Sequence, residues 1–294
     1  VLCGNCIRMC PQGAKKDISY MREVKFLIES GEKVVASIAP SFAAYFNQYD
    51  YRKTIALLKK LGFHHVEETA FGAYYTAMAT IEEMKESPGF WIGSACPSTV
   101  NLIEKYYPQF IPNLSRADSP VIAHAKLIKK HYGEDSHVVF ISPCAAKKLE
   151  VMEQNVKGLV DYPISFRELE EWGAEEGVNM EELEASEDFA RVAPGSARLF
   201  AIRGGILKAA KMETDYTATR HLSVSGAENI MTFLDNFRQK DYPELQFVDF
   251  LMCTGGCING PLGWKSLNPL NRIKVGEYQL AKDESGLEEG PMQD

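Results

Sequence analysis

Residues 253–260 have the sequence CTGGCING, and they follow a largely apolar run, FVDFL, at residues 247–251. A short apolar run bounded by turn residues is typical of a buried strand. Cys253 and Cys257 therefore stand just beyond a predicted strand end, where open α/β sheets place their ligand sites. The glycine pair between them has no Cβ, so the backbone can approach a bound group closely and adopt positive φ. This segment predicts an α/β fold with a thiolate site at the end of a strand.

Two further cysteines stand at the same place relative to a predicted strand. Cys96 follows the apolar run at residues 90–92, and Cys144 follows the one at residues 138–141. A lone cysteine is more often a buried core thiol than a ligand, but the combination with a Cys-x3-Cys loop makes that interpretation a poor one here. Four thiolates that converge from distant segments are the ligand set of a cubane iron–sulfur cluster. The predicted ligands are Cys96, Cys144, Cys253 and Cys257.

Predicted strands alternate with predicted helices along most of the chain, which indicates a mostly parallel sheet covered by helices. A strand at 33–38 opens one such unit, and a strand at 137–142 opens a second. We therefore predict an α/β fold of two lobes, each a mostly parallel sheet flanked by helices. The acidic residues 175–195 are expected to form a surface loop. The predicted divisions are a partial ferredoxin-type segment at 1–16, a main domain at 17–275 with lobes at about 33–132 and 137–260, and a poorly packed tail or linker at 276–294.

The composition excludes several classes of protein. The 294 residues carry a formal net charge of -8, which argues against a general nucleic-acid binder. No apolar run reaches the roughly 18 residues of a transmembrane helix, and the first residues lack the apolar core of a signal peptide. Seven cysteines, an odd number in metal-ligand spacings, fit a reducing compartment better than a disulfide framework. We therefore predict a cytoplasmic protein with neither a membrane nor a nucleic acid as partner.

The first residues contain a second cysteine pattern. Cys3, Cys6 and Cys10 form C-x2-C-x3-C-P, the last part of the bacterial ferredoxin run C-x2-C-x2-C-x3-C-P. In two-cluster ferredoxins the last cysteine of this run serves the other cluster, so Cys3 and Cys6 would bind a [4Fe-4S] cluster whose other ligands are missing. We expect the sequence to begin inside such a motif and this cluster to be absent or incomplete. A zinc site is the alternative, but three cysteines followed by proline favour iron–sulfur.

Taken together, these stretches resemble the active-site signatures of the [FeFe]-hydrogenase family, from about residue 34 to residue 262. The resemblance implies an H-cluster in the cleft between the two lobes. This cofactor is a [4Fe-4S] cubane joined to a two-iron centre that carries CO and cyanide. The resemblance also implies that Cys96, Cys144 and Cys253 are terminal ligands of the cubane, and that Cys257 bridges to the two-iron centre.

The same resemblance implies roles for residues around the two-iron centre. Lys147 matches the lysine whose ammonium group hydrogen-bonds one cyanide, and Glu150 matches an acidic residue near that lysine. Pro40 and Ser41 match a Pro-Ser pair whose backbone and hydroxyl contact the other cyanide. Without the family, Lys147 is an ordinary surface lysine and Ser41 is the N-cap of a helix.

Several residues depart from the pattern of the catalytic family members. Ala95 occupies the position at which a cysteine relays protons to the two-iron centre, and alanine cannot transfer a proton. The glutamate that continues the relay aligns with Ala79, or with Glu82 after a shift in register. Two methionines and a glutamine near the centre are replaced by Ser142, Leu251 and Val121. A positioned acid–base group contributes about 10²–10⁴-fold in rate, so we expect slow turnover and a likeness to the sensory branches of the family.

The resemblance implies a reversible but slow reaction of two protons and two electrons with H2, in an anaerobic organism. It implies as partners H2 and protons, a redox protein such as ferredoxin, maturation proteins that supply the two-iron centre, and a downstream signalling domain. The alternative is an iron–sulfur electron-transfer or cluster-assembly protein that holds only the cubane. Lys147, Pro40 and Ser41 count against that alternative, because a bare cubane has no cyanide to contact. A hydrogenase made without maturation enzymes would also hold only the cubane, and the sequence does not separate these two cases.

Overall fold

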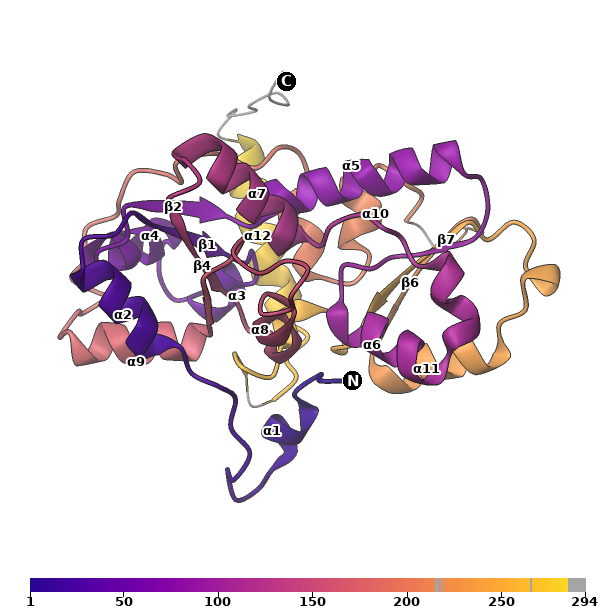
Figure 1. The fold of residues 1–294 in the computed structure, drawn as a ribbon, viewed down its shortest axis with the longest axis horizontal. Coiled ribbons are helices and arrows are strands. Elements are labelled where there is room, and N and C mark those ends of the chain that lie inside the picture. Colours follow the sequence, from indigo (N-terminus) through magenta and orange to yellow (C-terminus); the bar gives the residue numbers. More distant parts are fainter. Residues whose placement is uncertain (215–216, 218, 265, 285–294) are drawn as a thin grey trace.

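The computed structural model describes residues 1–214, 217, 219–264 and 266–284, and its strands form two sheets (Figure 1). The first sheet has the order β2 (His65–Glu68), β1 (Val34–Ile38), β4 (His137–Ile141), β5 (Tyr162–Ile164). The second sheet has the order β3 (Trp91–Ile92), β7 (Phe247–Leu251), β6 (His221–Ser225). The neighbouring strands of both sheets are parallel. The predicted α/β fold with two parallel sheets is therefore confirmed.

Helices lie on both faces of each sheet. The α-helices are α1 (Asn5–Met9), α2 (Met21–Glu29), α3 (Phe42–Tyr45), α4 (Tyr51–Lys60), α5 (Ala70–Glu86), α6 (Pro97–Tyr106), α7 (Pro120–Tyr132), α8 (Ala145–Glu150), α9 (Phe166–Glu175), α10 (Gly205–Ala209), α11 (Ala227–Asn236) and α12 (Asn271–Glu284). Short 3-10 turns are η1 (Pro108–Asn113), η2 (Ala197–Ala201), η3 (Gln239–Asp241) and η4 (Cys257–Asn259). None of these helices is long and apolar enough to cross a membrane, over the residues that the structure describes.

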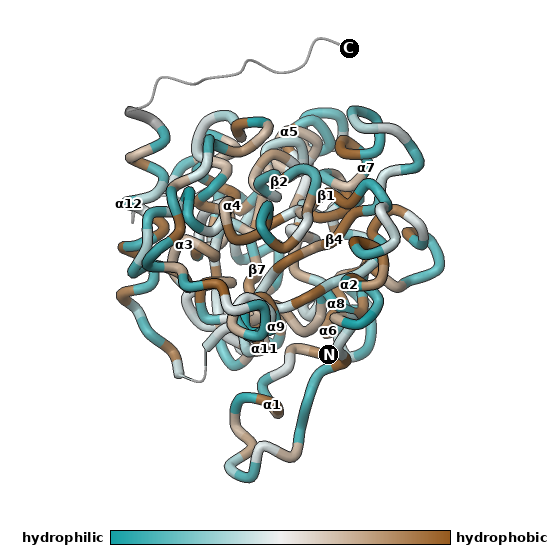
Figure 2. The backbone as a smooth tube through the Cα atoms, turned by 90° about the vertical axis from the view of Figure 1, so that its left-hand side faces the viewer, coloured by the Kyte–Doolittle hydropathy of each residue, from teal (hydrophilic) through white to brown (hydrophobic). Residues whose placement is uncertain are grey.

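Both faces of the first sheet are buried, which explains the unbroken apolar sequence of β1. Successive side chains of a strand point to opposite faces. Val34, Ala36 and Ile38 pack into a core shared with α2, α4 and α9, whereas Val35 packs on the opposite face beneath α7. Figure 2 shows these apolar strands in the interior of the molecule, with hydrophilic segments around them. The carboxyl ends of the strands are therefore the parts of the sheet left free to build a site.

The second sheet is buried in the same way. Val248 and Phe250 of β7 pack against α6 and α11, and Phe247 packs on the other face against α5 and α10. Helix α5 contacts both α7 and α10, and Figure 1 shows it running across the top of the molecule from one sheet to the other. This helix joins the two lobes into one body.

The predicted boundaries of the lobes are wrong. The strand β3, which falls within 33–132, belongs to the second sheet, whereas β4 and β5, which fall within 137–260, belong to the first. The chain leaves the first sheet after β2, adds β3 to the second sheet and then returns. Parallel neighbours are connected through long crossovers, so the order of strands along the chain does not reveal which sheet each strand joins.

The predicted tail at 276–294 is wrong as far as residue 284, and its remaining residues lie outside the described part. Residues 276–284 form the second half of α12. Tyr278 is buried and its hydroxyl donates a hydrogen bond to the carboxylate of Glu68, which also receives two hydrogen bonds from Arg198. A polar helix was mistaken for a linker because its few apolar residues fit a groove that only the folded chain provides.

The acidic segment at 175–195 forms irregular loops, as predicted, but it is not only a surface segment. Arg191 is buried, and its guanidinium donates two hydrogen bonds to the buried carboxylate of Glu67. Glu67 also accepts hydrogen bonds from His124 and from the hydroxyl of Tyr132. This network fastens the segment to the carboxyl end of β2.

Candidate metal centre

Cys96 and Cys144 occupy equivalent places in the two lobes. Each is the N-cap residue of a helix: Cys96 precedes α6, and Cys144 precedes α8. Both have extended backbone conformations, with φ and ψ of -100° and 104° for Cys96 and of -104° and 117° for Cys144. Because β3 leads to one and β4 to the other, the two sheets each contribute a thiol to the space between them.

The loop after β7 carries the other two thiols. Gly255 and Gly256 have φ of 82° and 109°, a region that L-residues rarely adopt, so the predicted need for glycine is confirmed. A Cβ on Gly256 would lie 2.6 Å from the carbonyl oxygen of Ala201. The backbone N–H of Gly255 donates to Ser225 Oγ at 3.0 Å. The loop is thus held tightly, with Cys253 and Cys257 at its two ends.

The structure brings the four cysteines together. Burial and, to a lesser extent, the neighbouring Cys96 raise the pKa of the Cys144 thiol to about 11. Burial also raises the pKa of Cys253 and of Cys257 well above the ordinary value, and Cys144 and Cys96 add to the shift in both. All four residues keep some solvent exposure. Mutual effects of this kind require short separations, so the predicted convergence from three segments is present in the fold.

Four converging thiols are the donor set of a cubane iron–sulfur cluster. No three His, Cys, Asp or Glu side chains of the described residues converge as the ligands of one metal ion would. A cubane takes one thiolate for each iron and so holds its ligands apart. Ligand thiols must lose their protons on binding, and the raised pKa values of Cys144, Cys253 and Cys257 oppose that loss until a metal takes the place of the proton.

Lys147 lies next to the thiols and is buried, so it is not an ordinary surface lysine. It stands one turn into α8, and both its backbone N–H and its charge lower the pKa of Cys144 against the larger effect of burial. Its Nζ donates to Glu150 Oε2 at 2.6 Å. The acidic residue that the resemblance placed near Lys147 therefore pairs with it directly.

Pro40 and Ser41 lie beyond the carboxyl end of β1 and are both buried. Ser41 stands at the N-cap position of α3, but its side chain makes no capping hydrogen bond. Its Oγ is buried and has no hydrogen-bond partner among the described residues. An unsatisfied buried hydroxyl costs about 1–3 kcal/mol, so the simple explanation of Ser41 as a helix cap fails. A polar group that binds beside Ser41 would satisfy this hydroxyl.

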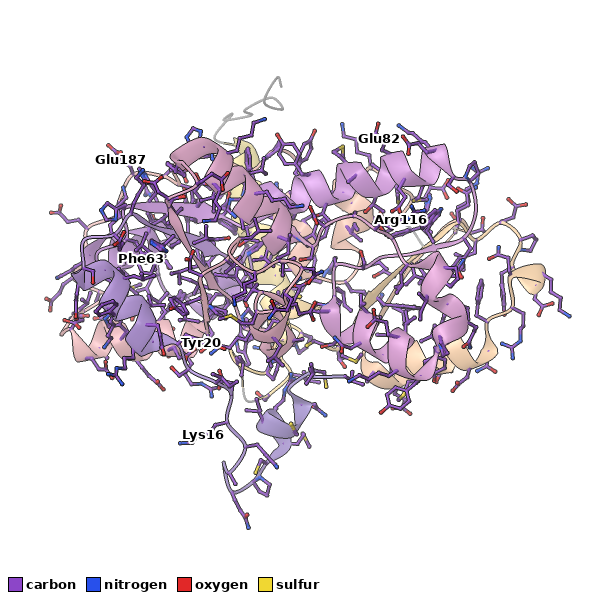
Figure 3. All side chains as sticks on the ribbon, in the orientation of Figure 1. Lys16, Tyr20, Phe63, Glu82, Arg116 and Glu187 are labelled. Carbon is purple, nitrogen blue, oxygen red and sulfur yellow. The ribbon has the colours of Figure 1, made fainter. Side chains whose placement is uncertain are left out.

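Of the residues predicted at the positions of the proton relay, Ala95 adjoins Cys96, whereas Ala79 and Glu82 lie away from the cysteines. Ala95 directly precedes Cys96, and the neighbouring Ser94 Oγ donates to the carbonyl of Ala117 at 3.3 Å. Ala79 and Glu82 are both exposed on the outer face of α5, and Figure 3 shows Glu82 at the surface. The alignment to either residue is therefore wrong, because helical periodicity turns both away from the core.

The inward face of α5 instead carries hydroxyl groups. Thr80 is buried and donates to the carbonyl of Thr76 at 2.8 Å. One turn further, Glu83 accepts a hydrogen bond from Ser115 Oγ at 2.7 Å. The sequence signal that could have found these residues is the alternation of small and threonine residues on one helical face. The three replacements expected near the centre, Ser142, Leu251 and Val121, are all buried.

The N-terminal segment projects from the body of the molecule, as Figures 1 and 2 show for α1. Cys6 is exposed, and Cys3 and Cys10 are partly exposed. Cys3 lies close enough to Cys253 to raise the pKa of that thiol. Arg8, which the sequence did not single out, lowers it and donates to the carbonyl of Asn259 at 2.7 Å. The first cysteine pattern is therefore adjacent to the four-cysteine site.

The residues present fit an H-cluster. The site provides four thiols, a buried ammonium group and a buried hydroxyl without a partner. The thiols would bind iron. The ammonium group and the hydroxyl would donate hydrogen bonds to the polar diatomic ligands that the resemblance implies. Glycine at position 256 lets the loop pack against the backbone of residues 201–203, which holds Cys253 and Cys257 in place.

Comparisons with known proteins agree with this chemistry. Residues 32–261 match the family model described as "Iron only hydrogenase large subunit, C-terminal domain". Iron hydrogenase 1 of Clostridium pasteurianum is 28% identical over 90% of this chain, and the match spans 56% of that protein, so this chain covers little more than half of it. Cytosolic iron-sulfur assembly component 3 of Pongo abelii is 24% identical over 88% of this chain and 69% of that protein.

A solved structure also supports the fold. The apo form of an [FeFe]-hydrogenase from Chlamydomonas reinhardtii superposes with a TM-score of 0.70 at 18% identity, over 92% of this chain and 91% of that one. At this identity the likeness concerns the fold alone. The family model, which covers most of the chain, carries the assignment: this chain belongs to the family of the iron-only hydrogenase large subunit, C-terminal domain.

Proposed function

We propose that this chain binds an H-cluster, a [4Fe-4S] cubane with a two-iron centre, and reacts reversibly but slowly with H2 as a hydrogen or redox sensor. Cys96, Cys144 and Cys253 are the terminal cubane ligands in this proposal, and Cys257 is the bridging one. The N-terminal Cys3, Cys6 and Cys10 belong to an iron–sulfur site through which electrons reach the cubane, and the closeness of Cys3 to Cys253 supports this route.

The observation that carries the proposal is the unpartnered hydroxyl of Ser41. The sulfide and thiolate sulfurs of a cubane accept only weak hydrogen bonds, whereas a cyanide ligand is a stronger acceptor for a hydroxyl. The buried Lys147 supports the same conclusion, because its ammonium group has two further protons to donate besides the one given to Glu150. Bonds from charged donors are the stronger kind. In this proposal Ser41 and Lys147 orient the two-iron centre.

The two-iron centre, when bound, supplies the metal site at which hydrogen is split or formed. The chain itself then has to move protons, and Ala95 has no group that can do so. The hydroxyl of Ser94 and, on the inward face of α5, that of Thr80 both donate to backbone carbonyls. A hydroxyl is a poor acid at neutral pH, so turnover is slow. Slow turnover suits a sensor, because a sensor responds to H2 bound at its site and does not need to form product quickly.

A second candidate function is cluster assembly or electron transfer with the cubane alone. The specific observations in its favour are the likeness to the Pongo abelii assembly component and the absence of a relay group at Ala95. In this case Ser41 and Lys147 would serve no ligand. Both candidates place the protein in the cytoplasm, with ferredoxin-like redox partners.

The deciding experiment is an infrared spectrum of anaerobic protein after loading with a synthetic two-iron cofactor, with and without H2. The proposal expects CO and cyanide bands that shift under H2. Cys257→Ser should lose the bands, whereas Cys6→Ser, which changes an exposed cysteine outside the four-cysteine site, should keep them. Protein with an intact cubane and no bands after loading would refute the proposal and support the assembly candidate.

A further inference from the structure

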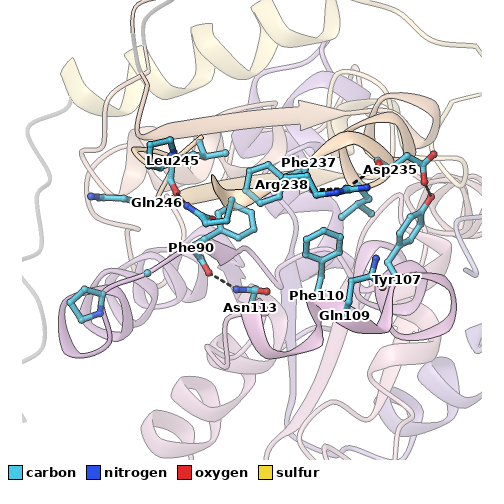
Figure 4. Close-up of a pocket in the computed structure, with 15 residues that line it drawn as sticks. Phe90, Tyr107, Gln109, Phe110, Asn113, Asp235, Phe237, Arg238, Leu245 and Gln246 are labelled. Atoms are coloured by element: carbon cyan, nitrogen blue, oxygen red, sulfur yellow. Dashed lines mark hydrogen bonds between the residues drawn. The ribbon is translucent and has the colours of Figure 1, made fainter. Parts of the chain in front are cut away.

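A cavity of about 820 Å³ lies at the end of the second sheet opposite the cysteines. Figure 4 shows its walls, which come from the segments before β3 and β7, from η1 and from the end of α11. Its lining includes four aromatic side chains, one arginine and several amides, among them Phe90, Tyr107, Phe110, Phe237, Arg238 and Gln246. Volumes of 300–1,000 Å³ with apolar walls and a few polar groups are typical of small-molecule sites.

Hydrogen bonds hold the polar frame of this cavity in place (Figure 4). The hydroxyl of Tyr107 donates to Asp235 Oδ1 at 2.9 Å, and Asn113 Nδ2 donates to the carbonyl of Phe90 at 2.9 Å. Arg238 Nη1 donates to the carbonyls of Asp235 and Phe237 at 3.2 and 2.7 Å. These bonds use one nitrogen of the guanidinium, and no ion pair of Arg238 is recorded among the described residues. The guanidinium is thus fixed in position with donors to spare.

The chemistry of the lining indicates its ligand. Phe90 and Phe237 are buried and pack against each other, with ring centroids 4.5 Å apart, whereas Phe110, 6.2 Å from Phe237, is partly exposed and offers a flat apolar surface to the cavity. Such surfaces stack on planar rings. Amide side chains at the rim, Gln109 and Gln246, can both donate and accept at the edge of a heteroaromatic ring. The free side of Arg238 suits a phosphate.

We propose that this cavity binds a planar heteroaromatic phosphate of nucleotide size, and that its occupancy acts on the four-cysteine site. The second half of this proposal rests on the proposed function. Helix α6 has Cys96 as its N-cap and Tyr107 as its C-cap, so one helix spans from the cluster to the cavity. Cys96 and Cys3 pack against the same hydrophobic core that provides Phe90 and Phe237 to the cavity wall. Strands β3 and β7 also run from the cavity toward the cysteines.

Binding can be measured by titration calorimetry on the full chain, with or without iron. The probes are adenosine 5′-monophosphate, adenosine and ribose 5-phosphate. We expect the monophosphate to bind saturably, adenosine to bind about tenfold more weakly, and ribose 5-phosphate not to bind. Absence of saturable binding of the monophosphate up to about 5 mM, or equal binding of ribose 5-phosphate, would overturn the site.

Variants locate the binding. Phe110→Leu keeps an apolar side chain and removes the ring, and Arg238→Gln removes the charge; each should weaken the monophosphate about tenfold. The controls are Phe26→Leu, an exposed phenylalanine on α2 outside the lining, and Arg272→Gln, on α12. The controls should bind as the unchanged protein does. Normal binding by both cavity variants would overturn the assignment.

The effect on the cluster has its own readout. Saturating monophosphate should shift the electron paramagnetic resonance signal of the reduced cubane, and Arg238→Gln should require about tenfold more probe for the same shift. An unchanged signal at saturation would overturn the coupling. If the protein binds the monophosphate but assembles no cubane, the proposed function fails and the cavity assignment stands.

Discussion

Replacement of Ser41 by alanine should stabilise the empty protein and reduce the stability that the protein gains on loading. In the protein without cofactor, the buried Oγ of Ser41 has no hydrogen-bond partner among the described residues. Ser41→Ala removes this unsatisfied hydroxyl and should raise the free energy of unfolding by about 1–3 kcal/mol. In the loaded protein the same change removes a donor to cyanide, so the stability gained on loading should fall by about 1–3 kcal/mol. The two measurements therefore move in opposite directions.

Two substitutions at other buried hydroxyl groups serve as controls for Ser41→Ala. Ser37 is buried like Ser41, but its Oγ is hydrogen-bonded to Thr69 and His124 at 2.8 and 2.7 Å, so Ser37→Ala should destabilise both forms. Thr54 Oγ1 is buried without a partner in α4, so Thr54→Val should stabilise both forms and leave the cyanide bands unchanged.

The assay is urea unfolding of anaerobic protein before and after loading, with infrared spectra of the loaded samples. Ser41→Ala should displace one cyanide band, and Thr54→Val should displace none. If Ser41→Ala lowers the stability of the empty protein, Ser41 has a structural partner and the reasoning is refuted. If it leaves both cyanide bands in place, the hydroxyl does not contact the two-iron centre.

Three further predictions concern the relay, the buried ion pairs and the last helix. Ala95→Cys should raise hydrogen evolution by about 10²-fold, the low end for a positioned acid–base group; unchanged activity would show that other residues limit the rate. Burial alone would raise the pKa of Glu67, but hydrogen bonds from His124 and Arg191 lower it to about 2 from 4.5. The contribution of the Glu67 carboxylate to the free energy of unfolding is therefore fully present above pH 4.5, and it is lost as the pH falls toward about 2. Glu67→Gln should cost about 3–5 kcal/mol at pH 7, and urea unfolding should show this cost shrinking between about pH 5 and pH 2; a constant cost would contradict the lowered pKa. Tyr278→Phe should cost about 1–3 kcal/mol, measured as a fall in thermal midpoint, and no fall would mean that α12 is not held through this hydroxyl.

The four-cysteine site could be predicted from the sequence because its determinants are local. Each cysteine follows an apolar strand, and the glycine pair between Cys253 and Cys257 has positive φ values in the structure, as the loop length requires. The capping box at the start of α9 is a determinant of the same local kind, with Ser165 Oγ accepting from Glu168 N at 3.2 Å. Interactions of this kind join residues that are close in the sequence, so the sequence alone is enough to predict them.

The tertiary structure decided what depends on distant segments. Strands β3 and β4 exchange lobes relative to their order in the chain, because a strand's partners are chosen by long crossovers and not by its own residues. The polar α12 is ordered because its Tyr278 meets Glu68. Ser41 looked like a helix cap in the sequence, and only the fold shows its hydroxyl buried without a partner. The sequence by itself thus determined which four thiols the fold brings together, because each follows a strand end, while burial and long-range pairing decided what surrounds them.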